Sequence, residues 1–320
     1  MDSKLETMTR RNFVVAQALT TSCLVGTRRA TCSEAPQAPS VAITMDDFNV
    51  GQAWPETAVK VNRQLLNLFD TYGVRITMFV TGCNVEDGSN RKLLQDWSDA
   101  GHVIANHTYS HFVINSPKHS LAEFQEDVLK AERILVGVPN YRRMFRFPAL
   151  KEGNTVELRD GMRRFLDVHG YRNGYVTIDA SDWYYSDRLA FRLRSAQTFD
   201  ISRFKGPYVS HIRDRSRYYD GLAHDVLGRS PQHTLLVHYS YLNAKFLGAV
   251  LEMYKRMGWR LVNSDDAFAD PVFRARPKTL PAGESLIWAL AKESGHYEGQ
   301  LRYPGEDGAY EKPTLDALGL

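Results

Sequence analysis

Short apolar runs alternate with amphipathic stretches along most of the chain. Residues 41–45 form the first run, and the stretch 59–69 that follows places Leu65, Leu66 and Phe69 on one face of a helix. The same pattern predicts further strands at 75–80, 102–106, 144–147, 171–178, 234–238 and 260–262. It predicts further helices at 92–99, 121–135, 156–169 and 242–257. Strands that alternate with helices in this way indicate parallel β-α-β units.

Two later segments depart from this alternation. Residues 187–230 are rich in Arg, Asp and Tyr, and we expect them to form an irregular helical insertion. The end of the chain contains Pro277 and Pro304, which is typical of a segment that wraps a surface. Because the sequence has no internal repeat, it predicts a single α/β domain at 39–275, with a tail at 276–320 that packs on it.

The beginning of the chain has the form of an export signal. Arg10 and Arg11 precede an apolar stretch at 13–26 that is too short to span a bilayer. A twin arginine before such a stretch indicates the twin-arginine route. We therefore expect 1–38 to be a signal and linker, and the mature protein to be periplasmic or extracellular without stable membrane insertion. Lipidation of Cys23 is not favoured, because no aliphatic residue lies three positions before it.

Charge and cysteine content narrow the classes of partner and site. The formal net charge of +3 on 320 residues is too small to indicate a nucleic-acid partner. The three cysteines, Cys23, Cys32 and Cys83, form no Cys-x-x-Cys pair. Removal of the leader would leave Cys83 alone, so a metal site in the mature protein must use nitrogen and oxygen ligands.

Polar clusters follow five of the predicted strands. They are residues 46–47, 106–111, 146–148, 179–183 and His238. In a β/α barrel the carboxyl ends of all strands meet at one rim, where barrel enzymes place their active sites. In an open sheet the same ends would be spread along a line. The sequence therefore predicts a barrel with a site at that rim.

Two histidines and a carboxylate are the predicted metal ligands. His107 and His111 are four residues apart, so on a helical turn they would project from one face. Together with Asp47 they would leave coordination positions open, as in a catalytic zinc site. The adjacent carboxylates of Asp46 and Asp47 repel each other unless cations offset their charge. A metal on one and an arginine on the other would do so.

His238 is the predicted general acid. It ends an apolar strand, and a protonated imidazole opposite the metal is what an amide leaving group needs. A neighbouring aspartate would keep the imidazole protonated, and Asp182 and Asp179 are both candidates.

These clusters, in this order, resemble the five motifs of the polysaccharide deacetylase family, also called the NodB homology or carbohydrate esterase family 4 group. Residues 44–47 resemble its Thr-Phe-Asp-Asp motif, and residues 107–111 fit its His-(Ser/Thr)-x-x-His motif. Residues 146–148 resemble Arg-x-Pro, residues 179–183 fit Asp-x-x-Asp-Trp, and residues 236–238 fit Leu-x-His. The resemblance implies a single-domain, distorted (β/α)7 barrel that holds a divalent metal: zinc, with cobalt or manganese as alternatives.

The resemblance also implies a role for each motif residue. The implied metal ligands are Asp47, His107 and His111. The implied catalytic residues are Asp46 as general base, Arg146 that orients it, His238 as general acid and Asp182 that tunes it. By the same resemblance, Trp183 would wall the pocket and the backbone N–H of Ala149 would bind the oxyanion. Phe48 and Phe147 are the further residues that we expect to contact the substrate.

Two departures from the family pattern bear on the substrate. Phe48 stands where the family usually has Gly, and Ala149 stands where it often has Tyr. We expect Phe48 to add bulk beside the metal, so the substrate need not be a long chitin-like polymer. The leading hypothesis is removal of N-acetyl groups from an amino-sugar polysaccharide or oligosaccharide. The alternatives are an O-acetyl esterase or an amidase on another substrate, and a non-catalytic glycan-binding relative, which the presence of Asp46 and His238 disfavours.

Overall fold

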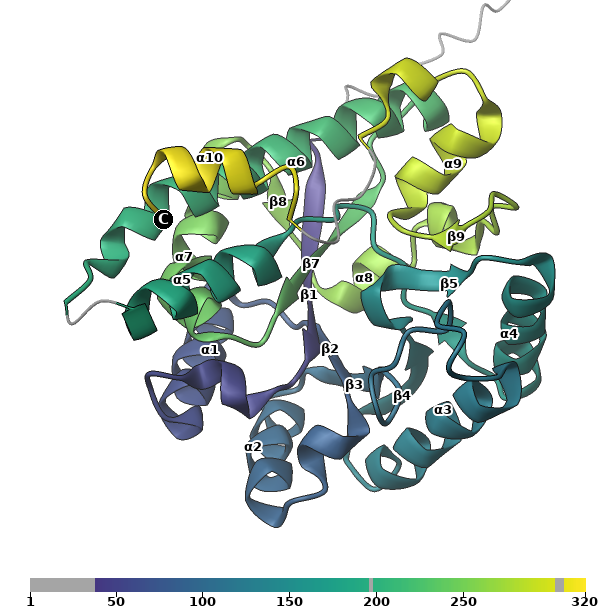
Figure 1. Cartoon of the computed structure of the whole chain (residues 1–320), viewed down its shortest axis with the longest axis horizontal. Coiled ribbons are helices and arrows are strands. Elements are labelled where there is room, and N and C mark those ends of the chain that lie inside the picture. The colour runs from purple at the N-terminus through teal and green to yellow at the C-terminus, as the bar shows by residue number, and fades with distance from the viewer. Residues whose placement is uncertain (1–37, 196–197, 303–307) are drawn as a thin grey trace, which may run out of the picture. The chain divides into compact units, whose positions relative to one another are not determined.

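The parallel sheet is built around one buried strand, β1 (Ser40–Asp47). The structure is a computed structural model that describes residues 38–195, 198–302 and 308–320, so the predicted export signal lies outside the described residues. Across the sheet the strands follow the order β6, β4, β3, β2, β1, β7, with β8 beside the start of β1 (Figure 1). Their bounds are β2 (Thr77–Val80), β3 (Val103–Asn106), β4 (Tyr141–Phe145), β6 (Arg172–Asn173), β7 (Gln232–His238) and β8 (Arg260–Leu261).

The sheet curls until its two ends meet. The segment that follows β6 forms a parallel bridge between Ile178 and Leu235 of β7. The N–H of Ile178 donates to the carbonyl of Thr234 at 2.9 Å, and the N–H of Leu236 donates to the carbonyl of Ile178 at 3.2 Å. This curled α/β sheet confirms the predicted fold class. The predicted strand at 171–178 is reduced to the two-residue β6 and this bridge, which is where the barrel is distorted.

Helices cover the outside of the curled sheet (Figure 1). The helices that follow the strands are α1 (Ala58–Tyr72), α2 (Gly88–Asp99), α3 (Leu121–Leu135), α4 (Val156–Val168), α7 (Tyr241–Arg256) and α8 (Ser264–Phe268). Short 3-10 turns lie at η1 (Val50–Ala53), η2 (Gly82–Val85), η3 (Pro148–Leu150), η5 (Pro271–Arg274) and η6 (Glu298–Gln300). In α1, Leu65 and Phe69 are buried as the spacing predicts, and Thr57 caps its first turn. Burial of these apolar faces against the sheet stabilises the fold.

The segment after β6 is more regular than the sequence predicts. It forms α5 (Asp182–Ser195), η4 (Ile201–Phe204) and α6 (Lys205–Leu227), so most of the predicted irregular insertion is ordinary helix. The reason is that Tyr208, Ile212 and Tyr219 recur at helical spacing on the buried face of α6. Aromatic residues supply this buried face, and their polar ends disguise the pattern in the sequence.

The C-terminal segment braces the rim beside β4. β9 (Ala282–Gly283) pairs antiparallel with β5 (Lys151–Gly153), and α9 (Leu286–Ser294) packs along α6. Gly283 has φ 116°, and a Cβ at this position would overlap the carbonyl oxygen of Leu150. The last helix, α10 (Lys312–Ala317), lies near the end of the chain.

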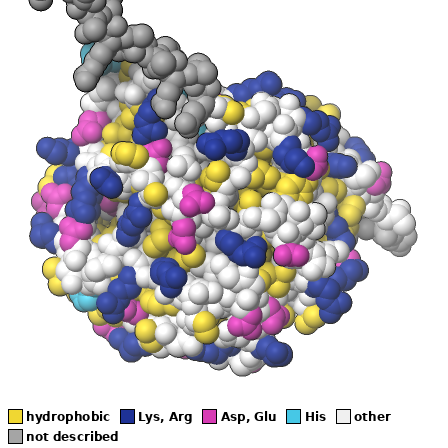
Figure 2. Space-filling view, turned by 180° about the vertical axis from the view of Figure 1, so that it is seen from behind, with side chains coloured by type: hydrophobic (Ala, Val, Ile, Leu, Met, Phe, Trp, Pro, Cys, Tyr) yellow, Lys and Arg dark blue, Asp and Glu magenta, His cyan; other side chains and the backbone are white. Residues whose placement is uncertain are grey.

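The surface and the helices give two further facts about the described residues. Basic and acidic side chains are interspersed on the face seen in Figure 2. Among the described helices, none combines the length and the apolar character needed to cross a membrane.

Candidate active site

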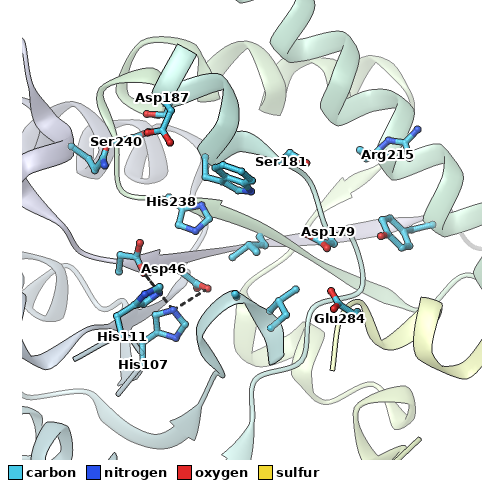
Figure 3. A pocket seen from close by; sticks show the side chains of 18 of the residues that line it. Asp46, His107, His111, Asp179, Ser181, Asp187, Arg215, His238, Ser240 and Glu284 are labelled. Carbon is cyan, nitrogen blue, oxygen red and sulfur yellow. Dashed lines mark ion pairs between the residues drawn. The ribbon is translucent and has the colours of Figure 1, made fainter. Parts of the chain in front are cut away.

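Side chains from several strand ends line one pocket at the rim. The pocket has a volume of about 340 Å³ (Figure 3). Its lining includes Asp46 and Asp47 from the end of β1, His107 and His111 after β3, and His238 from the end of β7. Five residues that lie far apart in the sequence therefore meet at one rim, as predicted.

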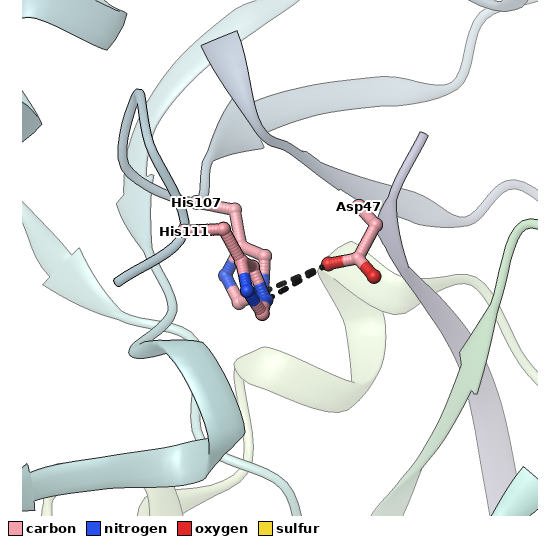
Figure 4. Close-up of side chains that lie close together, drawn as sticks. All are labelled: Asp47, His107 and His111. Atoms are coloured by element: carbon pink, nitrogen blue, oxygen red, sulfur yellow. Dashed lines mark ion pairs between the residues drawn. The ribbon is translucent and has the colours of Figure 1, made fainter. Parts of the chain in front are cut away.

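The predicted metal ligands converge on one point (Figure 4). Oδ1 of Asp47 lies 3.1 Å from Nε2 of His111 and 3.4 Å from Nε2 of His107. One ligand atom from each of the three lies within 4.8 Å of the other two. Oδ1 of Asp47 is buried, and no described residue hydrogen-bonds to it. A buried acceptor without a hydrogen-bond donor is costly, and a bound cation would remove this cost. The Asp47 oxygen and the two imidazole nitrogens are ligands that fit a divalent cation.

The loop that carries the two histidines differs from the predicted helical turn. Residues 107–111 form no helix, and φ is positive at Thr108 (64°) and His111 (58°). The prediction of a helical turn was wrong because the loop amides bond to side chains instead of to carbonyls one turn back. Oδ1 of Asn106 accepts the N–H of Thr108 at 2.9 Å, and Oγ1 of Thr108 accepts the N–H of His111 at 3.0 Å.

Asp127 of α3 holds the middle of this loop, and sequence reasoning missed it. Its Oδ2 accepts the N–H groups of Tyr109 at 3.0 Å and Ser110 at 2.9 Å. Its Oδ1 accepts the hydroxyl of Ser110 at 2.8 Å. An acidic residue within a helix is usually a solvated surface group, so its buried role gives no signal in the sequence.

The orientation of His107 is fixed from behind. Its Nδ1 lies 2.8 Å from the backbone carbonyl of Arg146. A carbonyl can only accept, so Nδ1 carries the proton and Nε2 keeps a free lone pair toward Asp47. This is the arrangement that orients histidine ligands in metal sites.

Asp46 faces an arginine rather than the histidine pair. Its Oδ1 accepts a hydrogen bond from Nη1 of Arg146 at 2.6 Å, while its Oδ2 lies 3.8 Å from Nε2 of His107. Arg146 also donates to Oγ1 of Thr44 at 2.9 Å and lies over the ring of Phe79 at 4.0 Å. Both charged groups are almost fully buried, so each compensates the charge of the other.

His238 is held by Asp182 and not by Asp179. Oδ1 of Asp182 accepts from Nδ1 of His238 at 2.8 Å, and Oδ2 accepts the backbone N–H of His238 at 2.7 Å. Burial alone would lower the pKa of His238, but the charge and hydrogen bond of Asp182 raise it to about 10, with help from the other nearby carboxylates. The imidazole is thus held protonated, with Nε2 left for the pocket.

A second layer of hydrogen bonds supports this pair. Nδ2 of Asn243 donates to Oδ2 of Asp182 and to the carbonyl of His238, both at 2.8 Å. The hydroxyl of Tyr208 in turn donates to Oδ1 of Asn243 at 2.6 Å. Asn243 and Tyr208 are fully buried, and neither carries a motif signal in the sequence.

Two of the four predicted substrate contacts line the pocket. Trp183 and Ala149 do, and Ala149 has a strained φ of 51°. Phe48 and Phe147 do not line it, and their role as substrate contacts stays a prediction. The ring of Phe48 is buried with its centroid 4.9 Å from that of Tyr239, and Phe147 belongs to a second apolar cluster.

Backbone strain gathers around this pocket. Among the described residues, the non-glycine positions with positive φ that also line the pocket are Asp47, His111, Ala149, Leu150 and Glu284. Positive φ is costly for residues other than glycine and persists only where the surroundings hold it. Such strain is typical of a site whose groups are held in place for function.

Comparison with known proteins agrees with the motifs. Residues 33–165 match the family model described as polysaccharide deacetylase. A peptidoglycan-N-acetylglucosamine deacetylase from Bacillus cereus is 31% identical over 143 residues, which are 45% of this chain and 46% of that protein. This chain therefore matches less than half of that relative's length.

Solved structures of carbohydrate esterase family 4 proteins are also similar. The peptidoglycan deacetylase PdaC from Bacillus subtilis has a TM-score of 0.48 at 20% identity, covering 73% of this chain and 92% of that one. A family 4 pseudoenzyme from Bacillus anthracis has a TM-score of 0.48 at 18% identity, covering 73% and 66%. The similarity to the polysaccharide deacetylase family is therefore shown for residues 33–165 of this chain.

Proposed function

We propose that this protein is a metal-dependent hydrolase that removes N-acetyl groups from an amino-sugar polysaccharide or oligosaccharide. The observation that carries the proposal is that a buried carboxylate, three residues that could hold a metal ion, and an imidazole hydrogen-bonded to an aspartate line the same pocket. Deacylation needs these three functions: a base, an electrophile and an acid.

The base and the acid are separate groups with opposite environments. Asp46, which a hydrogen bond from Arg146 orients, accepts the proton of the attacking water. His238, which Asp182 keeps protonated, donates a proton to the leaving nitrogen. The backbone N–H of Ala149 donates to the oxyanion of the tetrahedral intermediate.

Asp47, His107 and His111 would hold the cation, which we propose is zinc, with cobalt or manganese as alternatives. When bound, a divalent cation lowers the pKa of a water molecule and polarises the acetyl carbonyl. Asp46 lies beside this cluster without being part of it, which suits a base rather than a ligand.

An acetylated glycan is the proposed substrate, and the cell envelope or exterior is the proposed location. The relative from Bacillus cereus is named for N-acetylglucosamine in peptidoglycan, and the sequence predicts an export signal. Ala149 leaves the pocket wall without the expected aromatic ring, so an O-acetyl ester or a smaller amide is the alternative substrate.

The test uses metal-loaded protein and acetylated oligosaccharides, with acetate release as the readout. We expect Asp46→Asn to abolish turnover and leave the metal bound, which elemental analysis measures. Loss of the metal in this variant would refute our assignment of roles to Asp46 and Asp47. Release of acetate from O-acetyl esters alone would favour the esterase, and glycan binding without any release would favour a non-catalytic protein.

A further inference from the structure

The pocket extends beyond the proposed catalytic groups to a second wall. This wall includes Arg215 and Tyr219 from α6 and Arg302 from the C-terminal segment. In Figure 3, Arg215 lies across the pocket from His107 and His111. The family match ends at residue 165, so the wall is built by parts of the chain outside it.

Arg215 is a cation in this wall with an unused donor. Its Nη1 is buried, and no residue in the described part of the chain accepts a hydrogen bond from it. Arg215 shares the wall with a second guanidinium group, that of Arg302. Burial and the nearby charge of Arg302 lower the pKa of Arg215. A buried, unpaired donor on a charged group is costly unless a ligand satisfies it.

Two other charged residues that line this pocket have partners. Arg302 donates to Glu311, and Glu284 accepts from Lys151.

Asp179, the remaining carboxylate of this part of the pocket, is influenced by other cations. Burial raises the pKa of Asp179 to about 6, and the charges that oppose this shift are those of Lys151 and His238. Nη1 of Arg215 has no acceptor among the described residues, so it is left for a ligand.

We propose that Arg215 binds a carboxylate of the substrate, so that the preferred substrate is an acidic glycan. The carboxylate would lie on the acetylated amino sugar or on the sugar next to it. A guanidinium forms two parallel N–H to oxygen bonds with a carboxylate, and such bonds are strong in a partly desolvated wall. This inference rests on the proposed deacetylase function, and it adds the charge of the substrate to it.

The test compares two matched substrates. One is an N-acetylated oligosaccharide with a free carboxylate, and the other is the same oligosaccharide with that carboxylate converted to an amide. We expect wild type to prefer the acidic form by roughly 10- to 100-fold in kcat/KM, as one charge-assisted contact provides. Arg215→Ala and Arg215→Gln should remove this preference, by lowering kcat/KM for the acidic form to the value for the amide form.

Arg213→Ala is the matched control, because Arg213 lies on the same helix, pairs with its neighbour Asp214 and does not line the pocket. It should keep the preference for the acidic form. Unfolding midpoints identify any variant that does not fold, and the glutamine variant preserves most of the side-chain length if the alanine variant is unstable.

Calorimetric binding of the acidic oligosaccharide separates this inference from the proposed function. If no acetate is released but wild type binds the acidic form better than Arg215→Gln does, the function fails and the carboxylate site stands. If acetate is released but wild type treats the acidic and amide forms alike, the site is refuted and the deacetylase stands. Equal loss on both substrates in Arg215→Gln would also refute it.

Discussion

Replacement of Asp127 tests whether the metal site depends on a residue that never touches the metal. Asp127 is largely buried and accepts three hydrogen bonds from Tyr109 and Ser110, the residues between the two histidine ligands. In Asp127→Ala the two loop amides lose a charged acceptor. The loop then has little to hold φ positive at Thr108 and His111, and it relaxes.

The structure sets the expected size of the effect. A hydrogen bond to a charged group contributes about 1.5–3 kcal/mol to stability, and Asp127 accepts three such bonds. Groups that orient metal ligands typically contribute about 10- to 100-fold in metal affinity, which is about 1.4–2.8 kcal/mol. We therefore expect metal affinity to fall by roughly this factor in Asp127→Ala. The remaining loss should appear as a lower free energy of unfolding.

Competition between the protein and a chromophoric chelator for Zn²⁺ measures this affinity. Asp127→Asn keeps the size of the side chain and one carbonyl acceptor, so it should lie between wild type and Asp127→Ala. Glu126→Ala is the matched control, since Glu126 is the exposed neighbour on α3 and pairs with Arg133. A folded Asp127→Ala protein with the metal affinity of wild type would refute the reasoning.

Three further predictions concern the proposed general acid His238 and the pairing of β9 with β5. Asp182→Asn should move the pKa of His238 from about 10 toward 6.5, as an NMR titration measures. Because folding raises the pKa of His238, its protonation stabilises the folded protein fully below pH 6.5, and this stabilisation is lost as the pH rises through about 10. In denaturation experiments, the free energy of unfolding of Asp182→Asn should not show this decrease with pH. Asn243→Ala should lower kcat with little change in KM or metal content, and equal changes in both constants would contradict a positioning role. Gly283→Ala should lower the free energy of unfolding by more than about 1 kcal/mol, whereas Gly299→Ala, where a Cβ meets no atom within 4 Å, should not.

The sequence predicts the fold and the convergence of the site because both follow from local pattern. Apolar runs mark the strands, and the polar residues that end them must meet at one rim once the strands are parallel. The prediction that Asp47, His107 and His111 converge did not depend on the conformation of the loop between the histidines. Their convergence comes from where β1 and β3 end, and the wrong prediction of a helical turn did not affect it.

Contacts made by side chains from distant helices lie beyond such reasoning. Asn243 and Arg215 sit on helices where an amide or an arginine is ordinary surface composition. The direction of the Phe48 side chain is a different case, because Phe48 does not line the pocket. It is adjacent in sequence to two site residues, but a φ of 51° accompanies burial of its ring against Tyr239, away from the pocket. A position next to site residues in the sequence predicts that a residue lies at the rim, and the backbone dihedral angle determines where its side chain points.

The same dihedral control explains how two adjacent carboxylates take different partners. Asp46 ends the extended part of β1, and its side chain reaches Arg146. Asp47 has φ 73°, so the backbone turns and its side chain meets His107 and His111 instead. Aspartate tolerates this left-handed conformation better than most residues, which favours Asp over Glu at position 47 for conformation as well as for length. The separation of the proposed base from the proposed metal ligand therefore depends on one backbone angle at the end of one strand.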